Sequence, residues 1–271
     1  MNAPLAADTS PIRLDRLDDG LLRITLVDAK RRNALSMRMI CALAEAVAAA
    51  ATDAAVRVVI VAAEGPAFCA GHDLKELTAA RASEDRGRAF FEETMGNCAA
   101  LMTAIVRCPK PVIAEIAGVA TAAGCQLVAS CDLAIAAEGA SFATPGVHIG
   151  LFCSTPMVAL SRNVSRKHAM EMLLTGASIG AADAARMGLV NRVVPADRLT
   201  AETEAMARVI ASKSPLTLKI GKEAFYAQAE IGLDAAYAHA ARVMVENMLA
   251  RDAEEGIAAF IEKRPPVWEG R

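Results

Sequence analysis

Two segments of the chain place small residues directly before a helix start, around Gly71 and around Gly124. Each follows a run of strand-forming residues, at 56–63 and at 112–116, and is predicted as a strand, a tight turn and a helix. The first turn of a helix leaves backbone N–H groups without partners, at the positive end of the helix dipole. Two such ends are the minimum for binding a developing oxyanion. A small-residue helix in close packing is the alternative for the second segment, and from this stretch alone it is favoured.

Three consecutive cations, Lys30, Arg31 and Arg32, precede Asn33 and the helix that Ser36 is expected to cap. A cluster of this kind can bind phosphate groups, and the alternative is a loop whose charges are simply solvated. The four histidines have no metal-ligand spacing with a second His or with a Cys, so no metal site is predicted. The seven cysteines form no CxxC pair and read as reduced, buried thiols, for which we expect a cytoplasmic location.

Composition limits the function classes. With 271 residues and 54% hydrophobic content, the chain can bury one large core with a smaller appended domain. A net charge of −2 gives no electrostatic footprint for nucleic acid or for a membrane surface, and no apolar run reaches the length of a membrane span. The N-terminus has the features of neither a signal peptide nor a transit peptide, and residues 1–11 are expected to form a disordered tail.

The elements that must position these residues alternate between strands and helices up to about residue 194. We expect a hairpin at 12–27, and Glu115 is expected to reach the edge of its strand. Asp73 is expected to cap the helix that follows Gly71, and Gly188 to end another. Further strands are expected at 131–137 and 189–194. Further helices are expected at 83–107, 167–174 and 179–187, with one more from Ser154 or Thr155.

The last part of the chain is helical in pattern, with almost no strand signal. The helices are expected at 196–212, 215–229, 233–250 and 252–263. We therefore expect an α/β core at 12–198 and a helical domain at 199–271, whose amphipathic segments carry enough apolar residues to form an interface between subunits.

Seven motifs in order resemble the crotonase superfamily, the enoyl-CoA hydratase/isomerase family, over nearly the whole chain. They are RRNALS at 31–36, AFCAGHDLKEL at 67–77, KPVIAEIAGVATAAGCQLVASCD at 110–132, ASFATPGVHIG at 140–150, LLTG at 173–176, AARMGLVNRVV at 184–194 and FIEKR at 260–264. The resemblance implies a spiral of ββα units followed by a helical C-terminal trimerisation domain. It also implies a homotrimer or a pair of trimers, and a role in fatty acid metabolism.

The resemblance also assigns roles to residues. It implies that the backbone N–H groups of His72 and Ala123 bind the thioester carbonyl oxygen of an acyl-CoA and stabilise an enolate, with no cofactor beyond the coenzyme A of the substrate. The CoA would pass the cations at 30–32, with its adenine near Ala70, His72 and Leu74. Phe260 and Lys263 match positions that reach the CoA of a neighbouring subunit.

The sequence departs from the family at the positions of its acids. The two hydratase glutamates align with Gln126 and Gly146, and a third acid position aligns with Ser154, as in a glutamate-poor branch of the family. Gln126 can orient a water but has no proton equilibrium near neutral pH, and Gly146 offers no side chain. Replacing both with Glu is expected to raise hydration more than either single change.

Other titratable groups near these positions leave alternatives open. His72 could act as a base or line the pocket, and His148 could face the acyl group or be a satisfied loop histidine. Cys153 and Ser154 have no base placed beside them by sequence and are not expected to be nucleophiles. Two functions follow: an acyl-CoA-processing enzyme with an unidentified acid or base, or an acyl-CoA-binding protein with little turnover.

Overall fold

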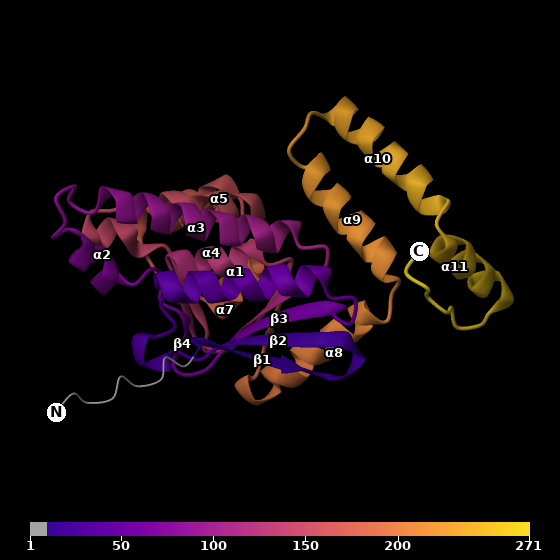
Figure 1. The fold of residues 1–271 in the computed structure, drawn as a ribbon, viewed down its shortest axis with the longest axis horizontal. Helices are drawn as coiled ribbons and strands as arrows, with labels where there is room; N and C mark the ends of the chain where they lie inside the picture. The colour runs from indigo at the N-terminus through magenta and orange to yellow at the C-terminus, as the bar shows by residue number, and fades with distance from the viewer. Residues whose placement is uncertain (1–9) are drawn as a thin grey trace.

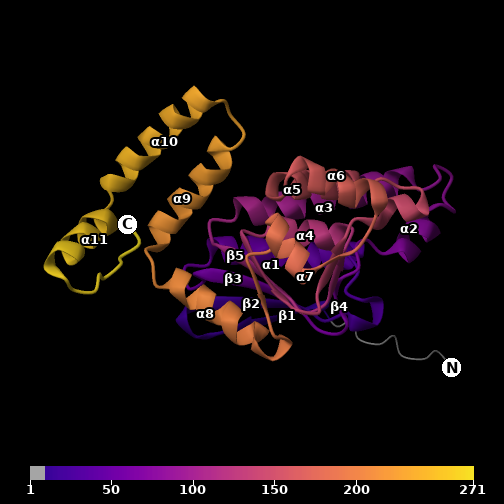
Figure 2. The same ribbon diagram turned by 180° about the vertical axis from the view of Figure 1, so that it is seen from behind.

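The computed structural model describes residues 10–271, which divide into a layered core and a projecting arm of helices (Figures 1 and 2). The main sheet of the core has the strand order β1-β2-β3-β5-β7-β10. Its strands are β1 (Ile12–Arg16), β2 (Leu21–Leu26), β3 (Val58–Ala63), β5 (Val112–Ile116), β7 (Leu133–Ala137) and β10 (Arg192–Val194). β1 and β2 form the expected antiparallel hairpin, and the other neighbouring pairs are parallel.

A second, smaller sheet has the order β4-β6-β8-β9. Its strands are β4 (Ala67–Cys69), β6 (Val119–Thr121), β8 (Ser141–Ala143) and β9 (Ile179–Gly180). The sequence did not predict these strands, because two or three residues carry no measurable period. Each strand β3, β5 and β7 is followed by a short strand of this sheet and then by a helix. The expected spiral of ββα units is therefore confirmed.

Helices cover both faces of the main sheet (Figure 1). One face carries α1 (Met37–Thr52), α3 (Arg88–Arg107) and α4 (Ala123–Ser130), whose buried residues form one large apolar cluster with the strands. The other core helices are α2 (Leu74–Ala80), α5 (Ser154–Asn163), α6 (Arg166–Thr175) and α7 (Ala181–Met187). Short 3₁₀ helices, η1 to η4, occupy Asp18–Gly20, Ala29–Arg31, Pro145–Ile149 and Ala196–Arg198. In the described part of the chain, no helix is long and apolar enough to cross a membrane.

The opposite face of the sheet carries α8 (Leu199–Ala211), which the sequence placed in the C-terminal domain. Ala207 and Ala211 are buried against Ile60 and Ile113, so α8 belongs to the core. The change from core to arm therefore falls after α8 rather than near residue 198. α8 also covers Glu115, which was expected at a strand edge: β5 is central, and the buried carboxylate binds Arg23 at 2.7 Å.

The caps that start and end the core helices follow the sequence. Ser36 accepts a hydrogen bond from the Met39 amide, Asp73 accepts from Lys75 and Glu76, and Gly188 ends α7 with a φ of 92°. Residues 1–9 of the expected tail lie outside the described residues. Pro11, which was included in that tail, is ordered: its carbonyl accepts a hydrogen bond from the Val27 amide at 2.9 Å.

The arm consists of α9 (Pro215–Gln228), α10 (Leu233–Met248) and α11 (Arg251–Glu262). α9 and α10 contribute no buried residue, in contrast to the core helices around β3 and β5. Large apolar side chains are exposed along the arm, reaching 85% at Phe260 on α11 and 77% at Leu249 directly after α10. The arm therefore has an apolar surface that its own chain does not cover.

Candidate active site

Two loops meet at the start of α4, one carrying Gly71 and the other Gly124. A Cβ built on Gly124 would lie 2.1 Å from the carbonyl oxygen of Cys69, which no side chain can tolerate. A Cβ on Gly71, whose φ is +87°, would lie 3.4 Å from the amide nitrogen of Ala123. The backbone at 69–71 is therefore in direct contact with the backbone at 121–124, at a separation that only glycine permits.

This contact brings together two unused amides. Among the described residues, the N–H groups of His72 and Ala123 donate no hydrogen bond within the chain, whereas the neighbouring amides of Asp73 and Ala122 bond to Leu35 and Ala143. Ala123 is the first residue of α4, at the positive end of its dipole. The two amides expected from the sequence are thus free to bind an acceptor supplied from outside the chain.

The turn before α4 is strained at Ala122, whose φ of 51° and ψ of −119° suit glycine rather than alanine. Its carbonyl accepts the first hydrogen bond of the helix, from Gln126, at 3.1 Å. The strain, of order 1 kcal/mol or more, fixes the direction of the Ala123 amide that follows.

The His72 side chain is largely buried, and no described residue bonds to its Nε2. Burial lowers the pKa of His72 below the usual 6.5, because the cation would lose its hydration. The imidazole is therefore held neutral. The sequence left two roles for His72, a base and a group that lines the pocket. A buried, neutral ring with an unpaired Nε2 suits either role.

Gln126 lies one turn into α4 and is 4% exposed, and its Oε1 has no partner among the described residues. Gly146 follows β8 and is also buried. A Cβ built on Gly146 would lie 2.8 Å from the Leu151 carbonyl oxygen and 3.0 Å from Cys153 Sγ. The space that an acid at 146 would enter is therefore filled by the loop at 151–153.

The neighbouring groups offer no nucleophile. Cys153 Sγ accepts a hydrogen bond from the Gly146 amide at 3.3 Å, and burial raises the pKa of its thiol. Ser154 is exposed at the start of α5, with its Oγ 3.3 Å from the Phe152 carbonyl oxygen. His148 is exposed, and its Nε2 donates to the Thr175 carbonyl at 2.9 Å, which agrees with a satisfied loop histidine.

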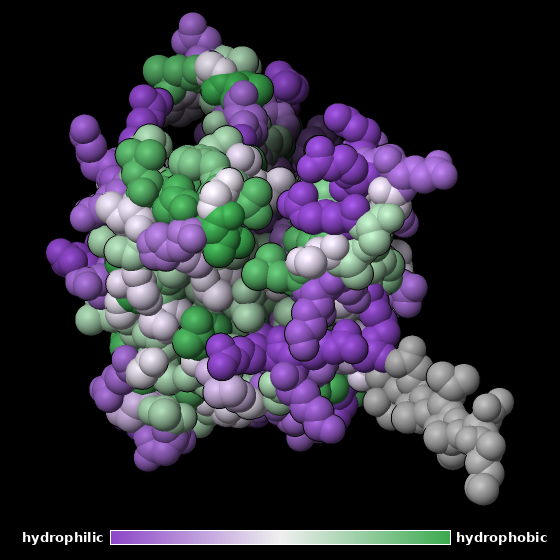
Figure 3. All heavy atoms as spheres, turned by 90° about the vertical axis from the view of Figure 1, so that its left-hand side faces the viewer, coloured by the Kyte–Doolittle hydropathy of each residue, from purple (hydrophilic) through white to green (hydrophobic). Residues whose placement is uncertain are grey.

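The three expected cations lie beside this site. Lys30, Arg31 and Arg32 are exposed at η2, and the Arg32 carbonyl accepts from the Ala70 amide at 3.1 Å. Arg31 also approaches Asp73, at 3.7 Å. On the face of the molecule shown in Figure 3, hydrophobic surface lies next to hydrophilic surface. The exposed apolar side chains close in sequence to the site positions are Leu74, Ile149, Leu151 and Phe152.

Two expected site residues are not brought to this place within one chain. Phe260 lies on α11 and Lys263 directly follows it, at the far end of the arm from α2 (Figure 1). Sequence reasoning also missed the contact between Gly146 and Cys153, since the two residues are brought together only by the turn of η3. In the described residues there is no cluster of three or more His, Cys, Asp or Glu that could hold a metal ion.

The spiral of ββα units with a helical C-terminal region is the crotonase fold. The crystal structure of an enoyl-CoA hydratase from Mycobacterium smegmatis superposes with a TM-score of 0.91 at 50% identity, covering 95% of this chain and 98% of that one. Human enoyl-CoA hydratase domain-containing protein 3 superposes with a TM-score of 0.90 at 48% identity, covering 95% of this chain and 100% of that one.

The sequence comparisons identify the family. The model of the enoyl-CoA hydratase/isomerase family matches residues 16–271, and the chain belongs to that family. The mouse mitochondrial enoyl-CoA hydratase domain-containing protein 3 is 47% identical over 266 residues, which are 98% of this chain and 87% of that protein. A probable enoyl-CoA hydratase of Mycobacterium leprae is 35% identical over 259 residues, covering 94% of this chain and 98% of that protein.

The expected cytoplasmic location is corrected by these relatives. The mouse, rat and human proteins of this group are all named mitochondrial. The cysteines could not have decided the matter. Six of the seven are buried, and burial raises the pKa of Cys98 to about 11 and of Cys125 to about 12, so these thiols are inert whatever the compartment.

Proposed function

We propose that the protein is an acyl-CoA-processing enzyme in which the amides of His72 and Ala123 bind the thioester carbonyl oxygen and stabilise an enolate. The observation that carries this proposal is the pair of free amides held together by the contact between the backbone at 69–71 and the backbone at 121–124. One donor of this kind is typically worth about 2.7–4 kcal/mol in the transition state. Because both donors are backbone groups, the side chains at 72 and 123 can vary without loss of the donors.

Hydration should be slow, because the two positions that would supply acid and base hold Gln126 and Gly146. Hydration of a 2-enoyl thioester needs a water activated on one side and a proton delivered to the α-carbon. Gln126 can hold a water through its unpaired Oε1 but cannot take up its proton near neutral pH. No carboxylate at 146 has room beside Leu151 and Cys153. A reaction that needs only enolate stabilisation fits this site better than hydration does.

The second candidate function is an acyl-CoA-binding protein with little or no turnover. The closure of the space at Gly146 favours it, since the chain has filled the position of a catalytic acid and kept the amides. The two functions share one binding mode. They differ only in whether Gln126, the neutral His72 or a water completes a reaction.

The path proposed for CoA uses charge and exposure at the mouth of the site. The phosphates meet the exposed cations at 30–32, and the adenine lies near Ala70, His72 and Leu74. Coenzyme A enters as part of the substrate, and no further cofactor is proposed.

The proposed assembly is a homotrimer formed through the arm. The apolar side chains exposed on α10 and α11 support it, because a lone chain would leave them in water. In such a trimer, Phe260 and Lys263 of one subunit would reach the CoA of the next. Light scattering at micromolar concentration tests this assembly, and a monomer would contradict it.

The experiment that tests the proposed function is a panel of saturated, 2-enoyl, 3-enoyl and 3-hydroxyacyl-CoA thioesters, each scored for binding and for turnover. Turnover of any member identifies an enzyme and its reaction. Binding of several members without turnover identifies the binding protein, and binding of none contradicts both functions.

A further inference from the structure

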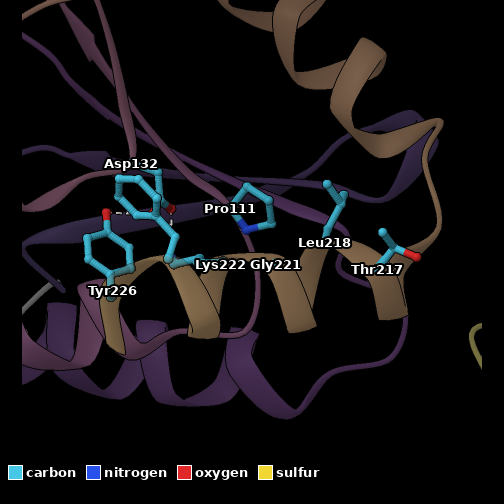
Figure 4. Close-up of a pocket in the computed structure, with 8 residues that line it drawn as sticks. Pro111, Asp132, Thr217, Leu218, Gly221, Lys222 and Tyr226 are labelled. Atoms are coloured by element: carbon cyan, nitrogen blue, oxygen red, sulfur yellow. Dashed lines mark hydrogen bonds and ion pairs between the residues drawn. The ribbon is translucent and has the colours of Figure 1, made fainter. Parts of the chain in front are cut away.

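The arm meets the core through a partly buried polar cluster between α9 and the residue that follows α4 (Figure 4). Lys222 Nζ donates to the Asp132 carboxylate at 2.6 Å and to the carbonyls of Lys110 and Ile105 at 3.0 and 3.1 Å. Tyr226, one turn later on α9, donates its hydroxyl proton to the other Asp132 oxygen at 2.9 Å. We call Lys222, Tyr226 and Asp132 the arm latch.

Every donor of the latch side chains, and both oxygens of the Asp132 carboxylate, have partners. The three ammonium protons of Lys222 have three acceptors, and Asp132 also accepts from the Val112 amide at 2.7 Å. The Lys222 side chain is 7% exposed and that of Asp132 16%. Ile105 belongs to the last turn of α3, where the helix dipole favours a cation. The charge of Lys222 is therefore fully matched in its docked position.

Little else on α9 holds it against the core. The helix has no buried residue, and beside the latch lies an open groove of about 340 Å³, lined by side chains that include Pro111, Leu218 and Phe225. At the outer end of α9, Arg162 pairs with Glu230 at 2.9 Å, but both side chains are more than half exposed. An exposed pair of this kind contributes little, whereas a buried pair is costly to break.

The core side of the latch is continuous with the candidate active site. Asp132 directly follows Cys131, which ends α4, and the first residue of α4 is Ala123. The Asp132 amide donates to the Val112 carbonyl at 2.9 Å, so this residue fixes the far end of α4 to β5. One residue thus anchors both the helix that carries a candidate amide, through its backbone, and the arm, through its carboxylate.

We propose that Lys222 is a positioning residue: the arm latch sets the position of the arm on the core, and through it the affinity for CoA. The second part rests on the proposed function, in which α11 of one subunit completes the CoA site of the next. Undocking α9 moves the whole arm, and with it Phe260 and Lys263, while the amides at 72 and 123 stay in place. The latch therefore acts on binding of CoA and not on the chemical step.

Hydrogen exchange measured on the full-length protein tests the docking directly. Lys222→Met keeps the length of the side chain and removes its charge, and should speed exchange in residues 215–228 by about a hundredfold, the equilibrium effect of breaking a buried pair. Exchange in β3 should not change. Lys219→Met, an exposed lysine on the same helix, is the matched control and should leave exchange as it is.

Two further variants separate docking from simple destabilisation. Lys222→Met with Asp132→Asn removes both charges and leaves no unpaired carboxylate, so exchange in the core strands should stay as in the unmodified protein while α9 remains fast. Tyr226→Phe removes one hydrogen bond and should have a smaller effect of the same kind. Unchanged exchange in α9, or equal acceleration of α9 and β3 in the double variant, would overturn the latch.

The affinity for CoA tests the second part. In Lys222→Met the dissociation constant of CoA should rise about tenfold, within the usual range of coupling between two sites. If the thioester panel gives turnover, KM should rise with kcat unchanged. Fast exchange in α9 with unaltered CoA affinity would overturn the positioning role. If the unmodified protein binds no CoA, the proposed function fails, and the exchange result still decides whether the latch docks the arm.

Discussion

At the start of α4 the amide of Ala123 lies open beside the loop that carries His72, whereas one turn later the amide side chain of Gln126 is buried with its Oε1 unpaired. Gly146, at the position that the family resemblance assigns to a second acid, is closed in by Leu151 and Cys153. In the proposed function, the half of the site that binds the carbonyl is therefore open. The half that would supply acid and base has no ionisable group at 126 or 146 and little space at 146.

The difference follows from where each half keeps its chemistry. Backbone donors are fixed by the turn and by two close approaches of glycine, so substitutions of other side chains leave them intact. A carboxylate is lost by a single substitution, and the vacated space can then be filled by a neighbouring loop. Binding and turnover can thus separate within one site, and the following variants test each half.

The largest effect is expected from Gly124→Ala, which breaks the carbonyl-binding half. The new methyl would lie 2.1 Å from the Cys69 carbonyl oxygen, so α4 must move away from β4. We expect a loss of about 3 kcal/mol in the free energy of unfolding, measured in urea, together with loss of acyl-CoA binding. Gly139→Ala, where the structure has open space, is the control and should change neither. Normal acyl-CoA binding by Gly124→Ala would show that the carbonyl binds elsewhere.

The next effect concerns the acid and base half. Gln126→Glu places a carboxylate within α4 without adding bulk and should raise hydration of crotonyl-CoA about a hundredfold, as one general base can. Gly146→Glu should add no rate, since its Cβ meets the Leu151 carbonyl at 2.8 Å. The sequence alone led us to expect the double change to exceed both single changes, and the structure reverses that order.

Gly146→Ala is the control for this steric argument, because it adds the Cβ without the carboxylate. It should lower the free energy of unfolding by about 1–3 kcal/mol, as overpacking does, and Gly146→Glu should lower it at least as much. Gly146 does not have a positive φ, so the cost comes from contact and not from backbone strain. A double variant that hydrates faster than Gln126→Glu would contradict the closure of this space.

A smaller effect is expected from the pH dependence of stability. Burial lowers the pKa of His72 in the folded state, so the unfolded chain binds more protons below about pH 6.5. The stability that the neutral His72 contributes is complete above that pH and is lost as the pH falls from there through the lower pKa of the folded state. His72→Gln should flatten this part of the unfolding profile while leaving acyl-CoA binding intact, since the backbone amide remains. An unchanged profile would contradict the buried, neutral state of the ring.

The smallest effect is expected at the exposed cations. Arg32→Ala and Lys263→Ala should each weaken CoA binding about twofold to fivefold at low salt, in keeping with exposed ion pairs, and the difference should vanish near 1 M salt. Lys167→Ala, an exposed lysine of α6, is the control. Unchanged affinity in both variants would reject the proposed CoA path and leave the amide half untouched.

Local chemistry explains what the sequence predicted well. The caps at Ser36 and Asp73, the glycine end at Gly188 and the helical pattern beyond residue 198 each depend on neighbouring residues. The glycine turns likewise predicted unpaired amides at two helix starts, which the family resemblance assigned to His72 and Ala123.

The features that were missed depend on distant contacts. Glu115 is buried because Arg23, 92 residues away, pairs with it, and α8 joins the core because its alanines fit the sheet. The latch between Lys222 and Asp132 spans 90 residues and has no local signal. The closure around Gly146 requires the path of the loop at 151–153, which no pattern specifies.

The central claim is that binding survives where hydration does not. The most direct measurement compares crotonyl-CoA hydration and the affinity for a saturated acyl-CoA in this protein and in a relative that carries both glutamates, under the same conditions. We predict similar dissociation constants, with hydration slower here by at least about a hundredfold, the contribution of one lost acid or base. Hydration as fast as in the two-glutamate relative would contradict the account and would mean that His72, or a carboxylate outside this site, supplies the missing group.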